Sequence, residues 1–301
     1  MHRKIIYLIN PVSGVKAKST VHDLIIKRTR EKKIDFDIIY TNQKGEYDFL
    51  KQKIVADKIT DVVICGGDGT VNAIASALLG TSVRIGIIPV GSGNGLAFSA
   101  KLPRQAGKAL DIIFSGHASF IDGFYINRDF SCMLCGIGFD ALVAHEFAKQ
   151  KTRGLQTYIR VSLTNFFKAK PYDFEIQHHQ KSFPANAFLI TVSNSNQFGN
   201  NFTIAPKASL NDGLLDVVIV KKMNKFALPF FMLRQITGIN GVQDLDKGIA
   251  KKNILYFQTP ELIIHNRSMA PLHVDGEPRG TSESFTIKVV SRAINLIQPA
   301  I

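Results

Sequence analysis

The chain has 301 residues, of which 45% are hydrophobic and 20% are charged, which excludes a disordered protein and predicts one large or two ordinary folded domains. Its net charge of +13 favours acidic partners such as nucleic acid, anionic lipid or a phosphorylated substrate. Because no apolar run approaches the roughly 20 residues that cross a bilayer, any membrane contact is expected to be peripheral.

Strand-like and helix-like segments alternate through the first part of the chain. Strands separated by single helices predict a parallel sheet covered on both faces and joined by right-handed crossovers. The expected strands are 4–9, 37–40, 61–65 and 84–90, and the expected helices are 17–33, 47–58, 71–79 and 104–114.

Strand-like runs then follow one another more directly, which predicts an antiparallel β-sandwich. The expected strands are 131–136, 174–178, 187–193, 215–220, 262–265, 272–274 and 285–290, with helices near 140–149, 154–168 and 225–237. The sequence therefore predicts a parallel α/β domain over residues 1–123 and a β-rich domain over 124–290, with residues 291–301 able to pack back on the first domain.

A glycine-rich stretch, GGDGTVN, lies at 66–72 between an expected strand and an expected helix. Ligands of open α/β sheets bind beyond the carboxyl ends of the strands, and glycines let the backbone approach a phosphate there. The stretch lacks the lysine of a Walker loop and the third glycine of a dinucleotide fingerprint. A triphosphate would therefore be held by backbone amides, Thr70 and a metal near Asp68. The alternative is a turn shaped only by tight packing.

Two similar loops fall at corresponding places. The stretch INPVSG at 9–14 follows the first expected strand, and PVGSGNG at 89–95 follows the fourth. Three small-residue loops after three parallel strands are expected to converge on one ligand cleft.

Acidic residues of the second half supply candidates for proton transfer. Asp275 and Glu277 lie in one turn, where a carboxylate could accept a proton from an attacking hydroxyl; the alternative is a pair of solvated acids. Asp122 lies at the expected domain junction and could equally be a structural cap. The stretch Asn211-Asp212-Gly213 taken alone is a favoured β-turn composition.

Together these segments resemble the lipid kinases that share a diacylglycerol kinase catalytic domain, a group that includes sphingosine and ceramide kinases. The resemblance rests on residues 10–14, 66–72, 89–94, 136–140, 211–213 and 275–278. It implies an ATP-binding α/β domain, a β-rich second domain, and an interdomain cleft where a lipid hydroxyl meets the γ-phosphate of Mg–ATP.

The resemblance also implies roles for single residues. Glu277 matches the proton acceptor, and Asp122 matches an acid that supports the active-site metal network, to which Asp68 would also contribute. Nucleotide contacts are implied for Asn10, Thr41, Gly66, Gly67, Asp68, Gly69, Thr70, Val71, Asn72 and Ser92. A structural Mg²⁺ would be held by Ser209, Asp212 and Leu214, the first and last through backbone carbonyls, since oxygen-only ligands suit magnesium.

Two positions depart from the family pattern. Many bacterial diacylglycerol kinases carry Asn-Asp where this chain has Asn94-Gly95, and the sequence of this chain at that point is more similar to the sphingoid-directed branch. The resemblance as a whole implies diacylglycerol as the leading acceptor, and this departure adds a sphingoid or related lipid as the alternative. Ala73 stands where a glutamate often follows the glycine-rich stretch.

Residues 149–170 mix basic side chains with Tyr158, Phe166 and Phe167. A helix with cationic and apolar faces can lie on an anionic membrane surface; the alternative is that its apolar residues pack on the second domain.

The first residues are typical of a strand rather than a secretory leader, so a cytoplasmic enzyme with peripheral membrane association is expected, and a homodimer is allowed.

The three cysteines are interpreted as buried thiols. Cys132 and Cys135 form one CxxC pair, whereas a zinc site needs about four ligands; a metal or redox role is the alternative.

Three other functions compete with that of a lipid kinase. An NAD kinase-like enzyme also uses a GGDGT loop, but the NPVSG and DGEP stretches favour a lipid kinase. A regulatory protein that binds nucleotide and lipid without catalysis is favoured by Ala73 and Gly95 and opposed by the intact Asp68, Asp122 and Glu277. A nucleic-acid binder lacks any recognisable module.

Overall fold

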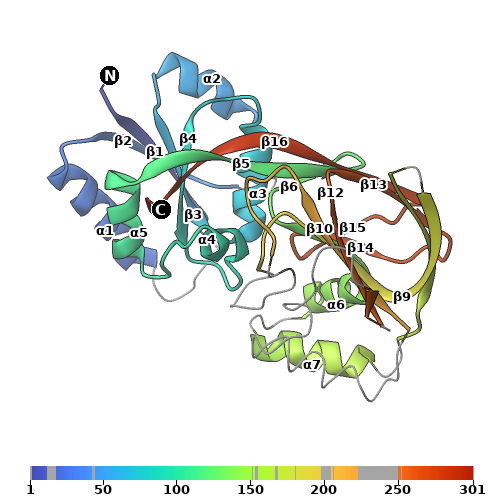
Figure 1. The fold of residues 1–301 in the computed structure, drawn as a ribbon. Helices are drawn as coiled ribbons and strands as arrows, with labels where there is room; N and C mark the ends of the chain where they lie inside the picture. Colours follow the sequence, from blue (N-terminus) through green and yellow to red (C-terminus); the bar gives the residue numbers. More distant parts are fainter. Residues whose placement is uncertain are drawn as a thin grey trace. The chain divides into compact units, whose positions relative to one another are not determined.

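The computed structural model describes residues 2–11, 18–42, 45–150, 152, 155–166, 169–179, 181–197, 205, 207–222, 250–251 and 253–300. The chain forms two compact units: the first unit is Met1–Ile121 with Arg292–Ile301, and the second unit is Asp122–Ser291 (Figure 1). The helix expected at 225–237 lies outside the described residues.

The first unit contains a parallel sheet with strand order β2-β1-β3-β4. The third strand is buried along its whole length and is apolar apart from Asp61, as expected of a strand covered on both faces. The last strand extends the sheet in parallel, with Asn295 beside Arg84 and Leu296 beside Ile85. The strands are β1 (Lys4–Ile9), β2 (Asp35–Tyr40), β3 (Asp61–Gly66), β4 (Arg84–Pro89) and β16 (Ser284–Gln298).

Helices connect these strands, as the alternating pattern predicts. The helices are α1 (Lys18–Glu31), α2 (Phe49–Ala56), α3 (Asp68–Ala77), α4 (Gly95–Ser99) and α5 (Ala106–Ser115). The first and last of them pack against each other over the sheet face to which Ile5, Tyr7 and Val63 point (Figure 1). The parallel α/β architecture is confirmed, and among these five helices the short α4 was not expected.

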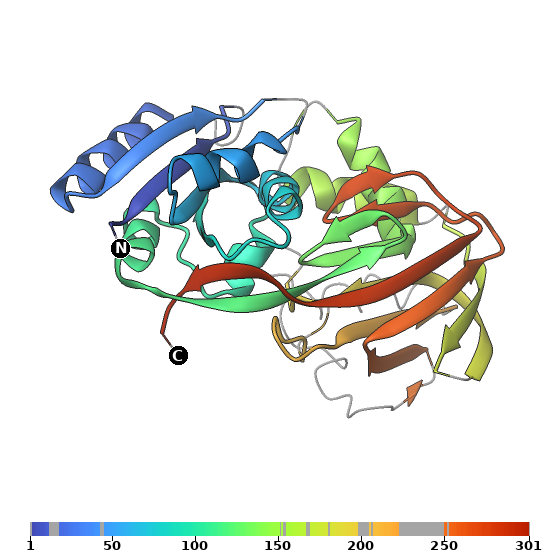
Figure 2. The same cartoon turned by 90° about the horizontal axis from the view of Figure 1, so that it is seen from above.

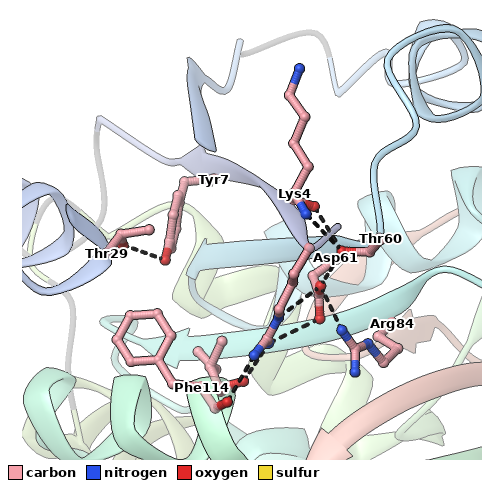
Figure 3. Close-up of polar contacts among 9 residues, drawn as sticks. Lys4, Tyr7, Thr29, Thr60, Asp61, Arg84 and Phe114 are labelled. Carbon is pink, nitrogen blue, oxygen red and sulfur yellow. Dashed lines mark hydrogen bonds and ion pairs between the residues drawn. The ribbon is translucent and has the colours of Figure 1, made fainter. Parts of the chain in front are cut away.

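A buried ion-pair network holds the amino end of this sheet (Figure 3). Asp61 is fully buried at the start of β3; it accepts two hydrogen bonds of 3.1 Å from Arg3 and one of 2.8 Å from Arg84. Arg3 also donates to the carbonyl oxygens of Ile113 and Phe114 at 2.6 and 2.8 Å, at the end of α5. The network joins β1, β3, β4 and α5 at the edge opposite the glycine-rich loops, so its role is structural.

The second unit is built of antiparallel strands with the order β11-β12-β10-β9-β8-β13-β16. A further branch runs from β9 through β7 and β14 to β15. The strands are β5 (His117–Ile126), β6 (Asp129–Ser131), β7 (Leu134–Gly138), β8 (Tyr172–His178), β9 (Lys181–Ser193), β10 (Leu215–Lys221), β11 (Ala250–Lys251), β12 (Ile254–Thr259), β13 (Glu261–Asn266), β14 (Leu272–Val274) and β15 (Glu277–Arg279). The antiparallel β-rich half is therefore confirmed.

The strands β5 and β16 pair with each other and each contributes residues to both units (Figure 2). Within β16 the backbone of Arg292 has a φ of 55°, which interrupts the regular strand at the point where the units divide. Its guanidinium group lies 4.3 Å from the ring centroid of Phe120 on β5.

Two helices, α6 (Phe139–Ala148) and α7 (Leu155–Phe166), pack side by side in the second unit (Figure 1). Phe166 of α7 meets the ring of Phe139 with centroids 5.8 Å apart and that of Phe188 with centroids 6.5 Å apart. These rings form a hydrophobic cluster with buried Val143 and Val161, which fixes α7 on α6.

One expected strand, 131–136, is only partly correct, because the chain forms β6 and β7 with a bend between them at Cys132 and Met133. The cause is a long-range contact: Asp275 accepts hydrogen bonds from the Ser131 hydroxyl at 2.6 Å and from the Leu134 amide at 3.1 Å. Both donors can reach one carboxylate oxygen only if the chain turns between them.

Candidate functional site

The carboxyl edge of the parallel sheet brings the first set of predicted residues together. Asn10 follows β1, Thr41 follows β2, the glycine-rich stretch follows β3, and Ser92 lies beyond β4. The amide of Asn10 donates to the Cys65 carbonyl at 2.9 Å, and that of Thr41 donates to the Ile9 carbonyl at 2.9 Å. Because the strands are parallel, the three loops that the sequence predicts to converge lie at one edge, and Thr41 lies at the same edge. Residues 12–17 of the first loop lie outside the described residues.

The glycine-rich stretch forms the end of β3 and the first turn of α3. Gly67 caps the helix in an extended conformation, and its carbonyl accepts the Val71 amide at 3.0 Å. The side-chain amide of Asn10 donates to the Thr70 hydroxyl at 2.8 Å, which ties the β1 loop to this turn. Gly69 is exposed, whereas Val71 and Asn72 are buried. The backbone of the first turn, rather than the last two side chains, is thus available to a ligand.

Two glycines from different loops approach each other closely at this edge. A Cβ atom on Gly91 would lie 2.4 Å from the Gly67 Cα atom and 2.9 Å from Asn94 Oδ1. No side chain fits at that distance, so the two loops meet backbone to backbone. Exposed peptide groups and a helix start suit the phosphates of a nucleotide, so the residues present fit that group.

Asn94, which belongs to the 89–94 motif, has a structural role that was not predicted from the sequence. Its carboxamide accepts a hydrogen bond from the Gly91 amide at 2.9 Å and donates one to the Gly91 carbonyl at 2.8 Å. It is 2% exposed and has a φ of 61°, a conformation that asparagine tolerates better than most residues. The sequence Gly-Ser-Gly-Asn could have indicated this role, because asparagine side chains often form hydrogen bonds to the backbone of such turns.

Asp68 joins the two glycine loops. Burial raises the pKa of Asp68 to about 6, although hydrogen bonds from the backbone amides of Asn94, Leu96 and Gly95 oppose the shift. These amides belong to the start of α4, so the carboxylate fastens that helix to the first turn of α3. The sequence analysis placed Asp68 near a metal; in the structure its carboxylate contacts the amides of α4.

The second unit brings Asp122 together with the turn predicted to hold magnesium. The Asp122 carboxylate accepts the Gly213 amide at 2.8 Å, and its own amide donates to the Leu210 carbonyl at 2.6 Å. Asp122 is 3% exposed, and its carbonyl also accepts the side-chain amide of Asn194 at 2.8 Å. This acid therefore anchors the 209–214 turn.

Within this turn the predicted ligands lie close together. The Asp212 carboxylate accepts the Leu214 amide at 3.0 Å, and the Ser209 hydroxyl donates to the Asn211 side chain at 3.1 Å. One carboxylate with nearby backbone carbonyls fits a magnesium ion that keeps several waters. Among the described residues there is no group of three or more His, Cys, Asp or Glu side chains that could hold a metal ion.

The Asp-Gly-Glu stretch forms a tight hairpin between β14 and β15. Asp275 has a φ of 52° and Gly276 a φ of 79°, the pattern of a two-residue type I′ turn. The Asp275 side chain accepts hydrogen bonds from Ser131 and Leu134, whereas Glu277 is exposed at the start of β15. Of the two acids in this turn, Glu277 is the one placed to meet a ligand.

The predicted membrane-facing helix corresponds to α7, and its aromatic residues differ from the expectation. Phe166 is buried, and the Tyr158 ring contacts the Phe147 ring with centroids 5.7 Å apart, so both lie on the packed side. Phe167 lies outside the described residues. Ile159 and Leu163 are the exposed apolar side chains, at 37% and 45%. No described helix is long and apolar enough to span a membrane.

The cysteines are free thiols buried in the two units: Cys65, Cys132 and Cys135. Burial raises the pKa of Cys65 to about 12, which disfavours its reactive thiolate form.

Comparison with known families accounts for both units. Residues 4–126 match the diacylglycerol kinase catalytic domain, and residues 134–298 match the YegS C-terminal NAD kinase beta sandwich-like domain. The chain belongs to the proteins that join a diacylglycerol kinase catalytic domain to a YegS C-terminal domain. This membership confirms the resemblance inferred from the motifs, and a kinase family implies ATP as the phosphoryl donor.

Individual relatives cover almost the whole chain. A "probable lipid kinase YegS-like" of Xanthomonas campestris pv. campestris is 27% identical over 283 residues, covering 90% of this chain and 89% of that protein. A diacylglycerol kinase of Bacillus subtilis is 25% identical over 301 residues, covering 98% of this chain and 96% of that protein. A crystal structure of a diacylglycerol kinase from Bacillus anthracis str. Sterne, 18% identical, has a TM-score of 0.75 and covers 98% of this chain and 97% of that one, which shows a shared fold.

Proposed function

We propose that this chain is an ATP-dependent lipid kinase that transfers the γ-phosphate of Mg–ATP to the hydroxyl of a membrane lipid, with diacylglycerol as the leading acceptor. The observation that carries the proposal is the contact of Gly67 with Gly91 inside a diacylglycerol kinase catalytic domain. This contact aligns two loops for backbone binding of phosphates. Relatives named as a lipid kinase and a diacylglycerol kinase support the same class of reaction.

In this proposal the first unit binds and orients the nucleotide. Backbone amides of the Gly67–Thr70 turn and of Ser92 bind phosphate oxygens, and Asn10 holds the Thr70 hydroxyl in place. Asp68 keeps the start of α4 beside this turn, so the spacing of the two loops is fixed. Magnesium, when bound, neutralises charge on the transferring phosphate.

The second unit supplies the proton acceptor. Glu277 is exposed on a hairpin whose turn is fixed by Asp275, so its carboxylate is held on a rigid support. A carboxylate in this position accepts the proton of the lipid hydroxyl as the oxygen attacks phosphorus. Asp122 holds the 209–214 turn, whose oxygen atoms would bind the structural magnesium.

The proposed lipid partner is supported by charge and by the outer side of α7. Ile159 and Leu163 are one helical turn apart and exposed, beside the exposed Arg160. An apolar pair flanked by a cation suits the surface of an anionic membrane. At the buried start of α4 this chain has Gly95, where many bacterial diacylglycerol kinases carry an aspartate. Because this difference is shared with the sphingoid-directed branch, sphingoid lipids are among the acceptors to be tested.

The test is transfer of labelled γ-phosphate from Mg–ATP to diacylglycerol, sphingosine, ceramide and monoacylglycerol in mixed micelles, with NAD in parallel. We expect one lipid product, and we expect Glu277→Gln to lower kcat at least about 100-fold, since a general base contributes roughly 10² to 10⁴ in rate. The matched control is Glu283→Gln, an exposed glutamate of the same unit, which should leave kcat unchanged.

Other results would contradict the proposal. Product from NAD alone would make the chain an NAD kinase-like enzyme. ATP binding without any product would favour a regulatory binding protein. Normal turnover in Glu277→Gln would remove Glu277 from the role of base while leaving the kinase activity established.

A further inference from the structure

A buried acid and a buried histidine meet beneath the Glu277 hairpin. Asp140 lies in the first turn of α6 and is 7% exposed, and His273 lies in β14 and is fully buried. Their side chains approach to 3.5 Å between Asp140 Oδ2 and His273 Nε2. Neither residue has a place in the mechanism above, although Asp140 ends the 136–140 motif and His273 lies two residues before the 275–278 motif.

The fold reserves space for this contact. A Cβ atom on Gly136 of β7 would lie 2.0 Å from Asp140 Oδ2 and 2.4 Å from His273 Nε2, so only glycine can stand there. The Asp140 carboxylate is oriented by two donors: the Ala141 amide at 2.9 Å on Oδ1 and the Thr191 hydroxyl at 3.2 Å on Oδ2. The oxygen that faces the histidine is thereby fixed.

The other nitrogen of the histidine contacts the hairpin turn. The Gly276 amide lies 3.2 Å from His273 Nδ1, and because a backbone amide can only donate, Nδ1 is the acceptor. In a neutral ring the proton is then on Nε2, the nitrogen beside the Asp140 carboxylate. The contacts thus form a chain from Asp140 through His273 to Gly276, the residue before Glu277.

The same helix holds the neighbouring residue of the strand. The His145 ring of α6 contacts the Leu272 carbonyl at 3.0 Å, one residue before His273. Asp140 and His145 of α6 therefore contact consecutive residues of β14, so the position of the helix is coupled to that of the hairpin.

We infer that Asp140 and His273 are positioning residues for Glu277: Asp140 selects the His273 tautomer that accepts the Gly276 amide, and this bond sets the conformation of the turn that presents Glu277. The inference rests on the proposed function, in which Glu277 is the proton acceptor. It assigns a role to the aspartate of the Gly-Ile-Gly-Phe-Asp stretch and to the histidine that precedes the Asp-Gly-Glu turn.

The decisive variant is Asp140→Asn. The Oδ1 atom of the new asparagine still accepts the Ala141 amide, so its NH₂ group faces His273 Nε2. A donor at that place favours the tautomer with the proton on Nδ1. That proton then points at the Gly276 amide hydrogen, and the hydrogen bond between Gly276 and Nδ1 is lost. We expect ¹⁵N NMR of the imidazole to show Nε2–H in the wild type and Nδ1–H in the variant, with faster hydrogen exchange at Gly276. We expect kcat to fall about tenfold or more while KM for ATP stays within about twofold.

The control and a second pair of variants exclude a loss of folding. Asp173→Asn changes an exposed aspartate of the same unit and should alter neither the tautomer nor kcat. Asparagine at 273 places an oxygen where Nδ1 lies, so His273→Asn should keep more of kcat than His273→Leu at similar thermal stability.

The outcomes separate the inference from the proposed function. A wild-type tautomer in Asp140→Asn, or a switched tautomer with normal kcat while Glu277→Gln is inactive, would overturn the positioning role. Equal kcat in His273→Asn and His273→Leu would also overturn it. A wild-type protein without kinase activity would refute the proposed function and this role with it, while the NMR result would still decide the His273 tautomer.

Discussion

Three buried carboxylates of this chain are balanced by different donors. Asp61 faces two guanidinium groups and Asp122 faces a backbone amide, whereas Asp216 accepts from the hydroxyl of Tyr256 and the side-chain amide of Gln258. Asp216 is fully buried with neutral donors. Burial raises the pKa of Asp216 to about 6, because neutral donors offset only part of the cost of burying its charge.

The first prediction concerns the pH dependence of stability. The folded pKa of Asp216, about 6, lies above its ordinary value of 3.8, so the native state holds the proton more tightly than the unfolded state. Its contribution to the free energy of unfolding therefore falls as the pH rises from about 4 to about 6, by up to about 3 kcal/mol. Asp216→Asn removes this contribution. Urea unfolding at several pH values should show the wild type losing stability relative to the variant over that window, and parallel curves would contradict the prediction.

At the scale of elements, the two glycine loops depend on backbone contact. The Gly91 position admits no Cβ atom because the Gly67 backbone is opposite, and backbone cannot move aside as a flexible side chain can. Gly107 in α5 offers a contrast, since the nearest atom to its added Cβ is Leu24 Cδ2 at 4.0 Å.

The second prediction compares these glycines. Gly91→Ala should separate the loops, lower ATP affinity at least about tenfold and destabilise the fold by about 1–3 kcal/mol, the usual cost of overpacking. Gly107→Ala should keep ATP affinity and stabilise the protein by about 0.5–1 kcal/mol, since alanine is the better helix former. Calorimetric titration with ATP and urea unfolding measure both effects. Equal ATP affinity in the two variants would show that the loop contact does not shape the nucleotide site.

The elements that the sequence predicts well are those with a strong local signal. The apolar run of β3 and the loop after it are both found where they are expected, because burial and glycine flexibility are local properties. The strand β5 was not expected, since Gly123 interrupts its apolar pattern. In the structure that glycine lies against the Phe130 ring, a contact that the local sequence does not predict. The bend between β6 and β7 depends on Asp275, far along the chain.

Some candidate site residues could likewise be predicted from local sequence, whereas others depend on contacts between distant parts of the chain. Asn10, Thr41 and Ser92 could be placed from the resemblance and from their position after strands. The contact of Asp140 with His273 could not, because 133 positions separate the two residues and no periodicity links them. Asn94 lay between these cases: its Gly-Ser-Gly-Asn context favours a closed turn, but its hydrogen bonds to Gly91 became evident only in the structure.

At the scale of the whole molecule, the net charge of +13 bears on how a protein without a described membrane-spanning helix could reach a lipid. Attraction between such a chain and an anionic surface acts over roughly a Debye length, about 10 Å at 0.1 M salt. The exposed pair Ile159 and Leu163 on α7 would add a short-range apolar contact that salt does not screen.

The third prediction separates these two contributions by vesicle co-sedimentation. The wild type should bind vesicles rich in phosphatidylserine more strongly than phosphatidylcholine vesicles, and binding should weaken severalfold as salt rises from about 0.05 M to about 0.5 M. Changing Ile159 and Leu163 together to serine should weaken binding at both salt concentrations, because apolar contact is lost. Val55→Ser is the matched control, since Val55 is 80% exposed on α2 of the other unit. Binding that ignores salt would exclude the net charge as the source of attraction, and equal loss in the Val55 control would exclude α7 as the contact surface.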